Sequence, residues 1–210
     1  MNNYIDLKNS KDYEKLKEAA EVIKQGGIVV FPTETVYGIG TNGLDKQAIK
    51  KLYEIKKRPF EKPISLLVSD FDMIERVARD ITDIEYNIME NFFPGPLTII
   101  LNKKDIVPDI LTSNGNTVGV RMPQDEITKK LIEYVGVPIA ATSANISGGK
   151  SGTNLEAIMK EFKREVNYFI DGGESKIGVS STVVKVIYNV PYILREGSIK
   201  KETIQNAINN

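Results

Sequence analysis

The sequence contains no cysteine and no histidine among its 210 residues. These absences exclude disulfide bonds, thiol nucleophiles, zinc sites built from these residues, and every catalytic triad that uses imidazole as its base. The chemistry that remains belongs to carboxylate, lysine, arginine, hydroxyl and main-chain groups, with hard cations such as magnesium held on oxygen ligands. Such groups suit the binding of phosphates and carboxylates, where charge and positioning provide most of the catalysis.

The chain also has no net charge, because 28 basic residues balance 28 acidic ones. It therefore has no overall attraction for nucleic acids or anionic membranes, and such binding would need a local patch. No apolar run approaches the ~18 residues that a membrane span requires. The first residues also lack the apolar core of a secretory signal. We expect a cytoplasmic protein without membrane contacts, folded as a single domain over residues 1–210.

Helical and extended patterns alternate along the chain. The expected helices begin near residues 13, 45, 69, 82, 127, 153 and 198. Asp45 is the expected N-cap of the second helix. Ser69 and Thr82 each stand three residues before an acidic residue, which is the pattern of a capping box.

Short apolar runs predict the strands IVVF, ISLLV, PLTIIL, TVGVRM, VPIAA, YFID, STVVKVI and YILREG. Asn114 and Gly115 are expected at the tip of a hairpin whose returning strand is TVGVRM. Because hairpins and helical crossovers both occur, the sequence predicts one α/β domain with a mixed sheet.

The stretch AATSANISGGKSGTN, residues 140–154, is one substitution from a phosphate-binding P-loop, with Ala144 in place of the first glycine. In a P-loop the helix begins at the Lys-Ser pair, so that its amides face the phosphates. Here Gly152 follows that pair and the helical pattern waits until Thr153. The P-loop hypothesis is therefore rejected in favour of a ligand site of another design. Its candidate donors are Ser143, Asn145, Ser147 and Ser151.

A second polar stretch, FPTETVYGIG at residues 31–40, follows the first strand of the core. It has two threonines, a glutamate and a tyrosine where the chain leaves the sheet, which is where open α/β folds place ligands. A turn whose hydroxyls satisfy the main chain is an equally good interpretation of this stretch alone.

The basic segment KKLYEIKKRPFEKP contains two cations with unusual positions. Lys56 falls on the apolar stripe of its helix, so we expect its ammonium to point past the edge of the core, toward a cleft. Arg58 comes just before Pro59, where the helix must stop. Arg121 and Arg195 stand at strand ends, and Ser180, Ser181 and Thr182 begin another strand. Cations and hydroxyls at strand ends suit a site for a nucleotide and a second anion.

Six motifs stand in order along the chain: GGIVVFPTETVYGIG, KKRP, TVGVRMP, TSANISG, SSTVV and LREGSI. In this order and spacing they resemble the YrdC-like family of threonylcarbamoyl-adenylate synthases. The resemblance runs from about residue 15 to residue 208. The length resembles the short, single-domain form of that family rather than the form with an additional C-terminal domain.

The resemblance implies a twisted, open α/β fold with a large concave cleft of positive charge. It implies that L-threonine, bicarbonate or carbon dioxide, and ATP with magnesium give threonylcarbamoyl-AMP and pyrophosphate. It also implies a partner transferase that moves the threonylcarbamoyl group to the adenosine beside the anticodon of certain tRNAs.

The resemblance further assigns roles to residues at matching positions. Lys56 and Arg58 match a Lys-x-Arg pair that acts in catalysis and ATP binding. Ser143 and Asn145 match a Ser-x-Asn pair that binds the nucleotide. The other expected ATP-binding residues are Lys62, Thr117, Ser151 and Arg195, and the expected threonine-binding residues are Thr35, Arg121 and Ser181. No residue is expected to bind a metal directly.

Two positions depart from the family pattern. Leu67 stands near the place where the long form has a histidine that helps hold threonine, so the pocket must be completed differently. Lys62 replaces an asparagine that is often found there. Two other functions remain open. One is an RNA-binding or rRNA-maturation module that uses the basic cleft, through which weak tRNA binding is also expected. The other is a paralogue that uses another carbamoyl acceptor.

Overall fold

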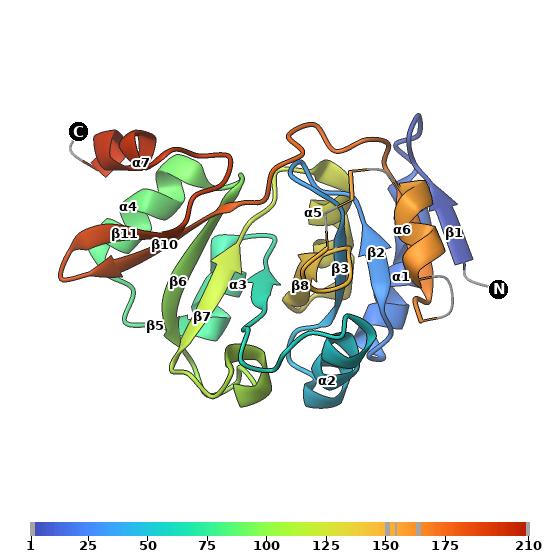
Figure 1. Cartoon of the computed structure of the whole chain (residues 1–210), viewed down its shortest axis with the longest axis horizontal. Helices are drawn as coiled ribbons and strands as arrows, with labels where there is room; N and C mark the ends of the chain where they lie inside the picture. Colours follow the sequence, from blue (N-terminus) through green and yellow to red (C-terminus); the bar gives the residue numbers. More distant parts are fainter. Residues whose placement is uncertain (1–2, 150–151, 154, 163–164, 209–210) are drawn as a thin grey trace.

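The computed structural model describes residues 3–149, 152–153, 155–162 and 165–208. In this part of the chain an 11-stranded β-sheet crosses the molecule, and the two ends of the chain lie at opposite ends of its long axis (Figure 1). The strands are β1 Asn3–Asp6, β2 Val29–Phe31, β3 Gly38–Asn42, β4 Ser65–Leu67, β5 Ala78–Arg79, β6 Leu97–Lys103, β7 Thr117–Arg121, β8 Ile139–Ser143, β9 Tyr168–Asp171, β10 Thr182–Ile187 and β11 Val190–Arg195.

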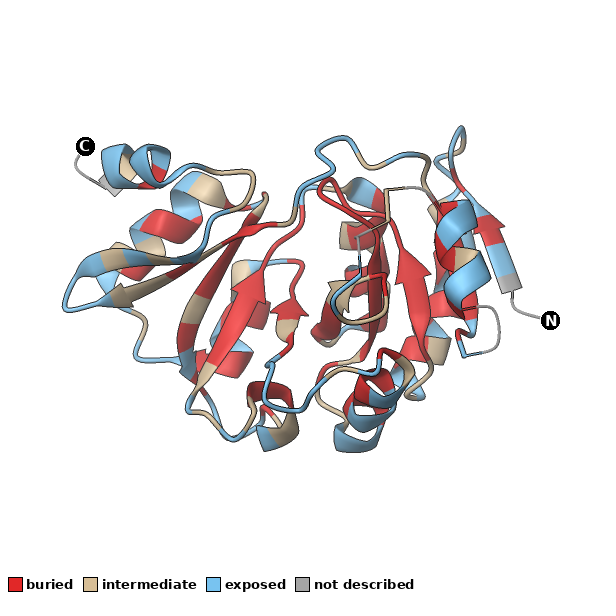
Figure 2. Ribbon diagram, in the orientation of Figure 1, coloured by how far each residue is buried: buried red, intermediate tan, exposed pale blue. Residues whose placement is uncertain are grey.

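The described helices are η1 Tyr13–Lys15, α1 Leu16–Lys24, α2 Lys46–Ile55, α3 Phe71–Val77, α4 Asp83–Phe92, η2 Asp109–Thr112, α5 Glu126–Val135, α6 Leu155–Phe162 and α7 Lys201–Ile208. None of them combines the length and the apolar character that crossing a bilayer requires. Burial is concentrated in the central strands, whereas the outer faces of the helices and much of β11 are exposed (Figure 2).

The strands follow the spatial order β1-β9-β2-β3-β8-β4-β7-β6-β10-β11, and β5 pairs with β6. The pairs β1–β9, β2–β9, β4–β7 and β6–β10 are parallel, and the remaining pairs are antiparallel. The predicted α/β fold with a twisted, open, mixed sheet is therefore confirmed.

Helix starts follow the capping residues, with one shift. Asp45 accepts hydrogen bonds from the main-chain N–H groups of Gln47 and Ala48, as predicted for the N-cap of α2. Thr82 forms the predicted capping box at α4. The prediction for Ser69 is wrong by one residue, because Asp70 caps α3 and its carboxylate accepts from the Met73 N–H at 2.7 Å.

The sequence did not predict β1, β3 or the two-residue strand β5. Strand β3 has glycine at positions 38 and 40, which weakens a strand pattern. In the structure a Cβ on Gly40 would lie 2.7 Å from the carbonyl oxygen of Ala140. Strands β3 and β8 pair across this contact, so the glycine allows a close approach that no other residue would.

Three further boundaries differ from the prediction. Strands β6 and β7 pair antiparallel as predicted, but η2 lies between them, so Asn114 and Gly115 close a longer connection. Helix α7 begins at Lys201 rather than at Ser198. Helix α6 begins at Leu155 instead of Thr153, and Asn154 lies outside the described residues.

The connection between β9 and β10, residues 172–181, runs across the sheet along one edge of the molecule (Figure 1). Its main chain is tied to the segment after β2: the N–H of Ile177 donates to the carbonyl of Glu34 at 2.9 Å, and that of Gly178 to the carbonyl of Thr35 at 2.8 Å. The crossing brings Ser180 and Ser181 to the middle of the sheet.

Asp171, the last residue of β9, anchors the N-terminal strand beside it. Its buried carboxylate accepts hydrogen bonds from Tyr4 Oη at 2.7 Å and from the Gly173 N–H at 3.0 Å, and it forms an ion pair with Lys8 Nζ at 2.9 Å. Burial alone would raise the pKa of Asp171, but the hydrogen bonds from Lys8, Tyr4 and Gly173 bring it below its ordinary value. The Asp171 carboxylate thus has a structural role.

We predict that Asp171→Ala lowers the free energy of unfolding by about 1–3 kcal/mol, since it removes a buried acceptor that receives partly buried hydrogen bonds. Lys8→Ala should cost less than ~1 kcal/mol, because its side chain is 48% exposed and its ion pair is solvated. Urea denaturation of the two variants compares them directly. Equal losses would mean that the exposed ion pair, rather than the buried hydrogen bonds, secures β1.

Candidate active site

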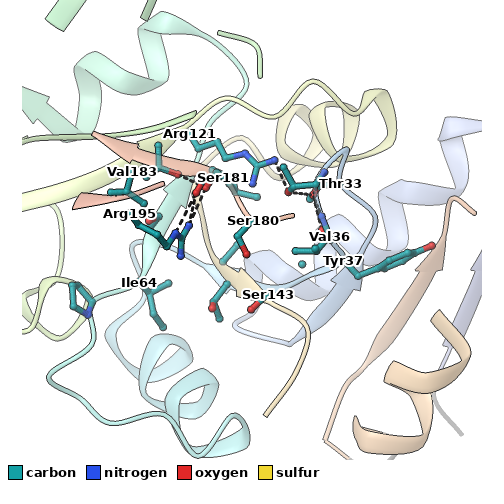
Figure 3. Close-up of a pocket in the computed structure, with 18 of the residues that line it drawn as sticks. Thr33, Val36, Tyr37, Ile64, Arg121, Ser143, Ser180, Ser181, Val183 and Arg195 are labelled. Carbon is teal, nitrogen blue, oxygen red and sulfur yellow. Dashed lines mark hydrogen bonds between the residues drawn. The ribbon is translucent and has the colours of Figure 1, made fainter. Parts of the chain in front are cut away.

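A cavity of about 360 Å³ opens where strand ends and the adjoining connections meet in the middle of the sheet (Figure 3). Six of the eleven residues that the sequence assigned to the site line it: Thr35, Arg58, Arg121, Ser143, Ser181 and Arg195. They come from distant parts of the chain, and the sheet order is what brings them together. Among the described residues that line the cavity there is no aspartate and no glutamate.

Arg121, at the end of β7, is held by a buried ion pair. Its Nη2 donates to Glu34 Oε1 at 2.8 Å and to Thr35 Oγ1 at 2.9 Å. Both Arg121 and Glu34 are 8% exposed. Within the described residues, Arg121 Nε and Glu34 Oε2 have no hydrogen-bond partner. Because buried polar atoms are seldom left without partners, this pair is suited to receiving a polar group of a ligand.

Arg58 and Arg195 have a different environment. Within the part of the chain that the structure describes, Arg58 donates to the carbonyls of Lys62 and Pro63, and Arg195 donates to Ser181, so neither contacts a carboxylate. Burial, and then the charges of Arg121 and Arg58, lower the pKa of Arg195, and burial lowers that of Arg58. The cavity therefore holds positive charge without a matching negative one, which favours an anion such as a phosphate group.

Arg195 is positioned by a close approach of two segments. Its Nη2 lies 2.8 Å from the carbonyl oxygen of Ser181, whose Oγ shares a hydrogen bond of 2.9 Å with Thr98 Oγ1. A Cβ on Gly197 would lie only 2.1 Å from the carbonyl oxygen of Ser180. Glycine is therefore required where the end of β11 passes the start of β10.

Lys56 does not line the cavity, and the expectation that its ammonium points into an open cleft is wrong. The residue is 1% exposed, and Nζ donates to the carbonyl oxygens of Ser143 and Asn145, both at 2.5 Å. A buried ammonium must find acceptors, and the chain turns these two carbonyls toward it as β8 ends. Burial, and then the charge of Arg58, lower the pKa of Lys56 to about 7.

Asn145 is also buried beneath the cavity rather than lining it. Its Nδ2 donates to the carbonyls of Ile146 at 2.7 Å and Gly149 at 3.0 Å, so this amide shapes the loop that follows β8. Asn145 Oδ1 has no partner in the described ranges. Ser151 and Lys150 lie outside the described residues.

Two expected ATP-binding residues are not brought to the cavity. Thr117 stands at the opposite end of β7 from Arg121, in an adjoining cavity of about 180 Å³ that also contains Lys185. Lys62 has an exposed side chain, and its carbonyl accepts from Arg58 Nε at 2.9 Å. Leu67, the residue at the place of the family's histidine, does line the cavity.

Three residues of the site, Glu34, Thr98 and Gly197, were not predicted from the sequence. Glu34 could have been identified from the sequence, since it stands between two threonines just after a strand. Thr98 could not have been identified, because its contact with Ser181 joins positions 83 residues apart. Gly197 could not have been identified either, because its role depends on the path of the segment that contains Ser180.

The described residues contain no group of three or more carboxylates that could hold a metal ion. The cavity offers hydroxyl and main-chain oxygens beside guanidinium groups. A divalent cation here would depend on oxygens that an anionic ligand provides.

Comparison with known proteins gives relatives over nearly the whole chain. It is 41% identical over 204 residues to the threonylcarbamoyl-AMP synthase of Pyrococcus abyssi, covering 97% of this chain and 60% of the relative. It is 37% identical over 195 residues to the threonylcarbamoyl-AMP synthase of Bacillus subtilis, covering 92% of this chain and 56% of the relative. The crystal structure of P. abyssi Sua5 complexed with L-threonine matches with a TM-score of 0.95 at 41% identity, covering 98% of this chain and 60% of that one.

The chain thus spans less than two thirds of the length of these two curated relatives. The family model that matches carries the description "Telomere recombination" and aligns with residues 21–197. The resemblance seen in the six sequence motifs is confirmed: the chain belongs to the family of Sua5, YciO and YrdC proteins.

Proposed function

We propose that the protein is an L-threonylcarbamoyladenylate synthase, which converts L-threonine, bicarbonate or carbon dioxide, and ATP to threonylcarbamoyl-AMP and pyrophosphate. The observation that carries the proposal is the distribution of charge in the cavity. Arg121 is paired with a carboxylate, whereas Arg58 and Arg195 are not. Arg121 therefore suits the carboxylate of an amino acid, and Arg58 and Arg195 suit a polyphosphate.

Threonine binding is assigned to Arg121, Thr35 and Ser181, which line the cavity. The Arg121 guanidinium, fixed by Glu34, can bind the substrate carboxylate, and the two hydroxyls lie at the same cavity. That the similar P. abyssi Sua5 has been crystallised with L-threonine supports this assignment. Leu67 in the lining provides apolar contact in place of an imidazole.

The nucleotide is assigned to Arg58, Arg195 and Ser143, which line the cavity. The buried Lys56 holds the carbonyls of Ser143 and Asn145. Lys62, Thr117 and Ser151 complete the proposed ATP-binding set at the positions that match the family pattern. Magnesium would enter with ATP as part of the substrate, because the lining provides no carboxylate ligands for a resident ion.

The reaction needs no strong base from the protein. The amine nitrogen of threonine attacks the carbon of carbon dioxide, forms the N–C bond and loses a proton to water. A carbamate oxygen then attacks the α-phosphorus; the new O–P bond forms as the bond to the bridging oxygen breaks, and pyrophosphate leaves. Nucleophile and electrophile are both anionic, so guanidinium groups that reduce their repulsion and hold them in line provide the catalysis.

The product is a mixed anhydride of a carbamic acid and a phosphate, which reacts readily with amines. Such a product calls for an enzyme that transfers its carbamoyl group. We propose that a downstream transferase passes the threonylcarbamoyl group to the adenosine beside the anticodon of tRNA, in the cytoplasm. Weak contact of tRNA with the cationic cavity fits this proposal.

Pyrophosphate release from ATP should require both L-threonine and bicarbonate, because the proposed nucleophile forms only when both are present. The measurement is a coupled pyrophosphate assay, with mass spectrometry of the adenylate product. Equal turnover with ATP alone would contradict the proposal.

Arg58→Ala should lower threonine-dependent turnover by about 10²-fold, on the scale of removing one preorganised charge contact near the reacting phosphate. Lys51→Ala, which removes an exposed cation from the same segment, is the control and should leave turnover unchanged. Lys56→Ala should show a comparable loss, but with a lower melting temperature as well, since two buried carbonyls lose their donor. A fully active Arg58→Ala protein would remove this residue from the site.

Asn145→Ala should impair synthesis at subsaturating ATP more than Lys150→Ala. Removing the amide frees the carbonyls that shape the loop beside the cavity, at a cost of about 1–3 kcal/mol. A lysine that makes no preorganised contact with the nucleotide contributes less than ~1 kcal/mol, as an exposed ion pair does. The two variants are compared side by side at one ATP concentration, and the reverse order would restore a phosphate-binding role for the Gly-Lys-Ser segment.

A further inference from the structure

The loop after β8, residues 143–149, forms part of the cavity. Its Ala144 and Asn145 side chains are buried, and Ile146 packs against the core. Ser143 lines the cavity, whereas Gly148 and Gly149 at the other end are exposed and have no side chains. Gly148 has a φ of +92°, a conformation that glycine adopts without strain. Polar contacts that other elements make with its main chain add to this packing in setting the position of the loop.

Lys56 provides the contacts on one side. Its ammonium holds the carbonyls of Ser143 and Asn145, and its own carbonyl accepts from the Ser147 N–H at 3.1 Å. Lys56 is the C-cap of α2, so that helix fixes three points of the loop.

Glu161 provides a contact on the other side. It lies on the last turn of α6, and its Oε1 accepts a hydrogen bond from the main-chain N–H of Ile146 at 2.8 Å. The apolar face of α6, with Leu155, Ile158 and Phe162 buried in the core, holds this carboxylate in place. Glu161 itself is exposed.

We propose that Glu161 is a positioning residue that acts with Lys56 to fix the 143–149 loop from two sides, so that Ser143 is presented to the nucleotide. The effect expected on ATP kinetics rests on the proposed function. The effect expected on the order of the loop does not. The charge of Glu161 has a second effect: it opposes burial and the Arg58 charge, both of which lower the pKa of Lys56. The carboxylate thereby favours the charged form of the lysine that holds the opposite side of the loop.

The structural test uses amide hydrogen exchange of residues 143–149 in the protein without substrates. Glu161→Ala should raise exchange in this loop, and Glu161→Gln should restore most of the protection, because its amide oxygen can still accept from Ile146. Glu156→Ala is the matched control on the same helix, since Glu156 is ion-paired only with the neighbouring Lys160 among the described residues. Unchanged exchange in Glu161→Ala would overturn the proposal.

The kinetic test separates a positioning role from general destabilisation. Glu161→Ala should raise the KM for ATP by about 3- to 10-fold, the loss expected for one hydrogen bond to a charged group at an exposed site. The kcat and the KM for L-threonine should change less than about twofold, and Glu161→Gln should recover the KM for ATP. An equal loss in the alanine and glutamine variants, or a fall in kcat alone, would overturn the positioning role.

The exchange experiment also separates this proposal from the one on which its kinetics depend. If Glu161→Ala loosens the loop while the unmodified protein shows no threonine-dependent turnover, the positioning role is supported and the proposed function fails. Since Glu161 is exposed, its variants should melt within about 2 °C of the unmodified protein, as surface substitutions do.

Discussion

The cavity depends on one buried ammonium group. Lys56 fastens the end of β8 to the end of α2 through two main-chain carbonyls, and with them it sets the position of Ser143. A charge that is 1% exposed is stable only where acceptors replace its water, so the loop and the lysine determine each other's conformation. The Lys-x-Arg and Ser-x-Asn motifs, 87 residues apart, are therefore two halves of one structural unit.

The arginines around this unit differ in their hydrogen-bond partners. Arg121 shares a buried ion pair with Glu34, whereas Arg58 and Arg195 are oriented by main-chain carbonyls, which direct a guanidinium without neutralising it. Carbonyl contacts thus leave the charge available to a ligand. The arrangement allows two anions of different kinds to lie in one cavity, one beside a compensated arginine and one beside uncompensated arginines.

The sequence predicted most of the fold, because helix caps and apolar runs act locally. It also selected six residues that line the cavity, since motif order identified the family and the family pattern assigned them, but four other assigned residues do not line it and a fifth lies outside the described residues. What it could not predict depends on distant contacts. Strand β3 was missed because its glycines, which look like loop residues, serve the close approach to β8. The burial of Lys56 was missed because helical spacing places a side chain on a face without showing what covers that face. The positions of Thr98 and Gly197 depend in the same way on segments far away in the chain.

The order of the strands also determines when the cavity can form. Strands β9 and β10 are consecutive in the chain, yet six strands lie between them in the described sheet. Strand β10 pairs instead with β6, which lies far earlier in the chain. Pairings between such distant segments have high contact order and form slowly. On the ribosome, the central strands and Arg121 emerge well before Ser181 and Arg195, which close the far side of the cavity. A nascent chain therefore has the buried core before it has a complete anion-binding site, and it gains that site only with its last strands.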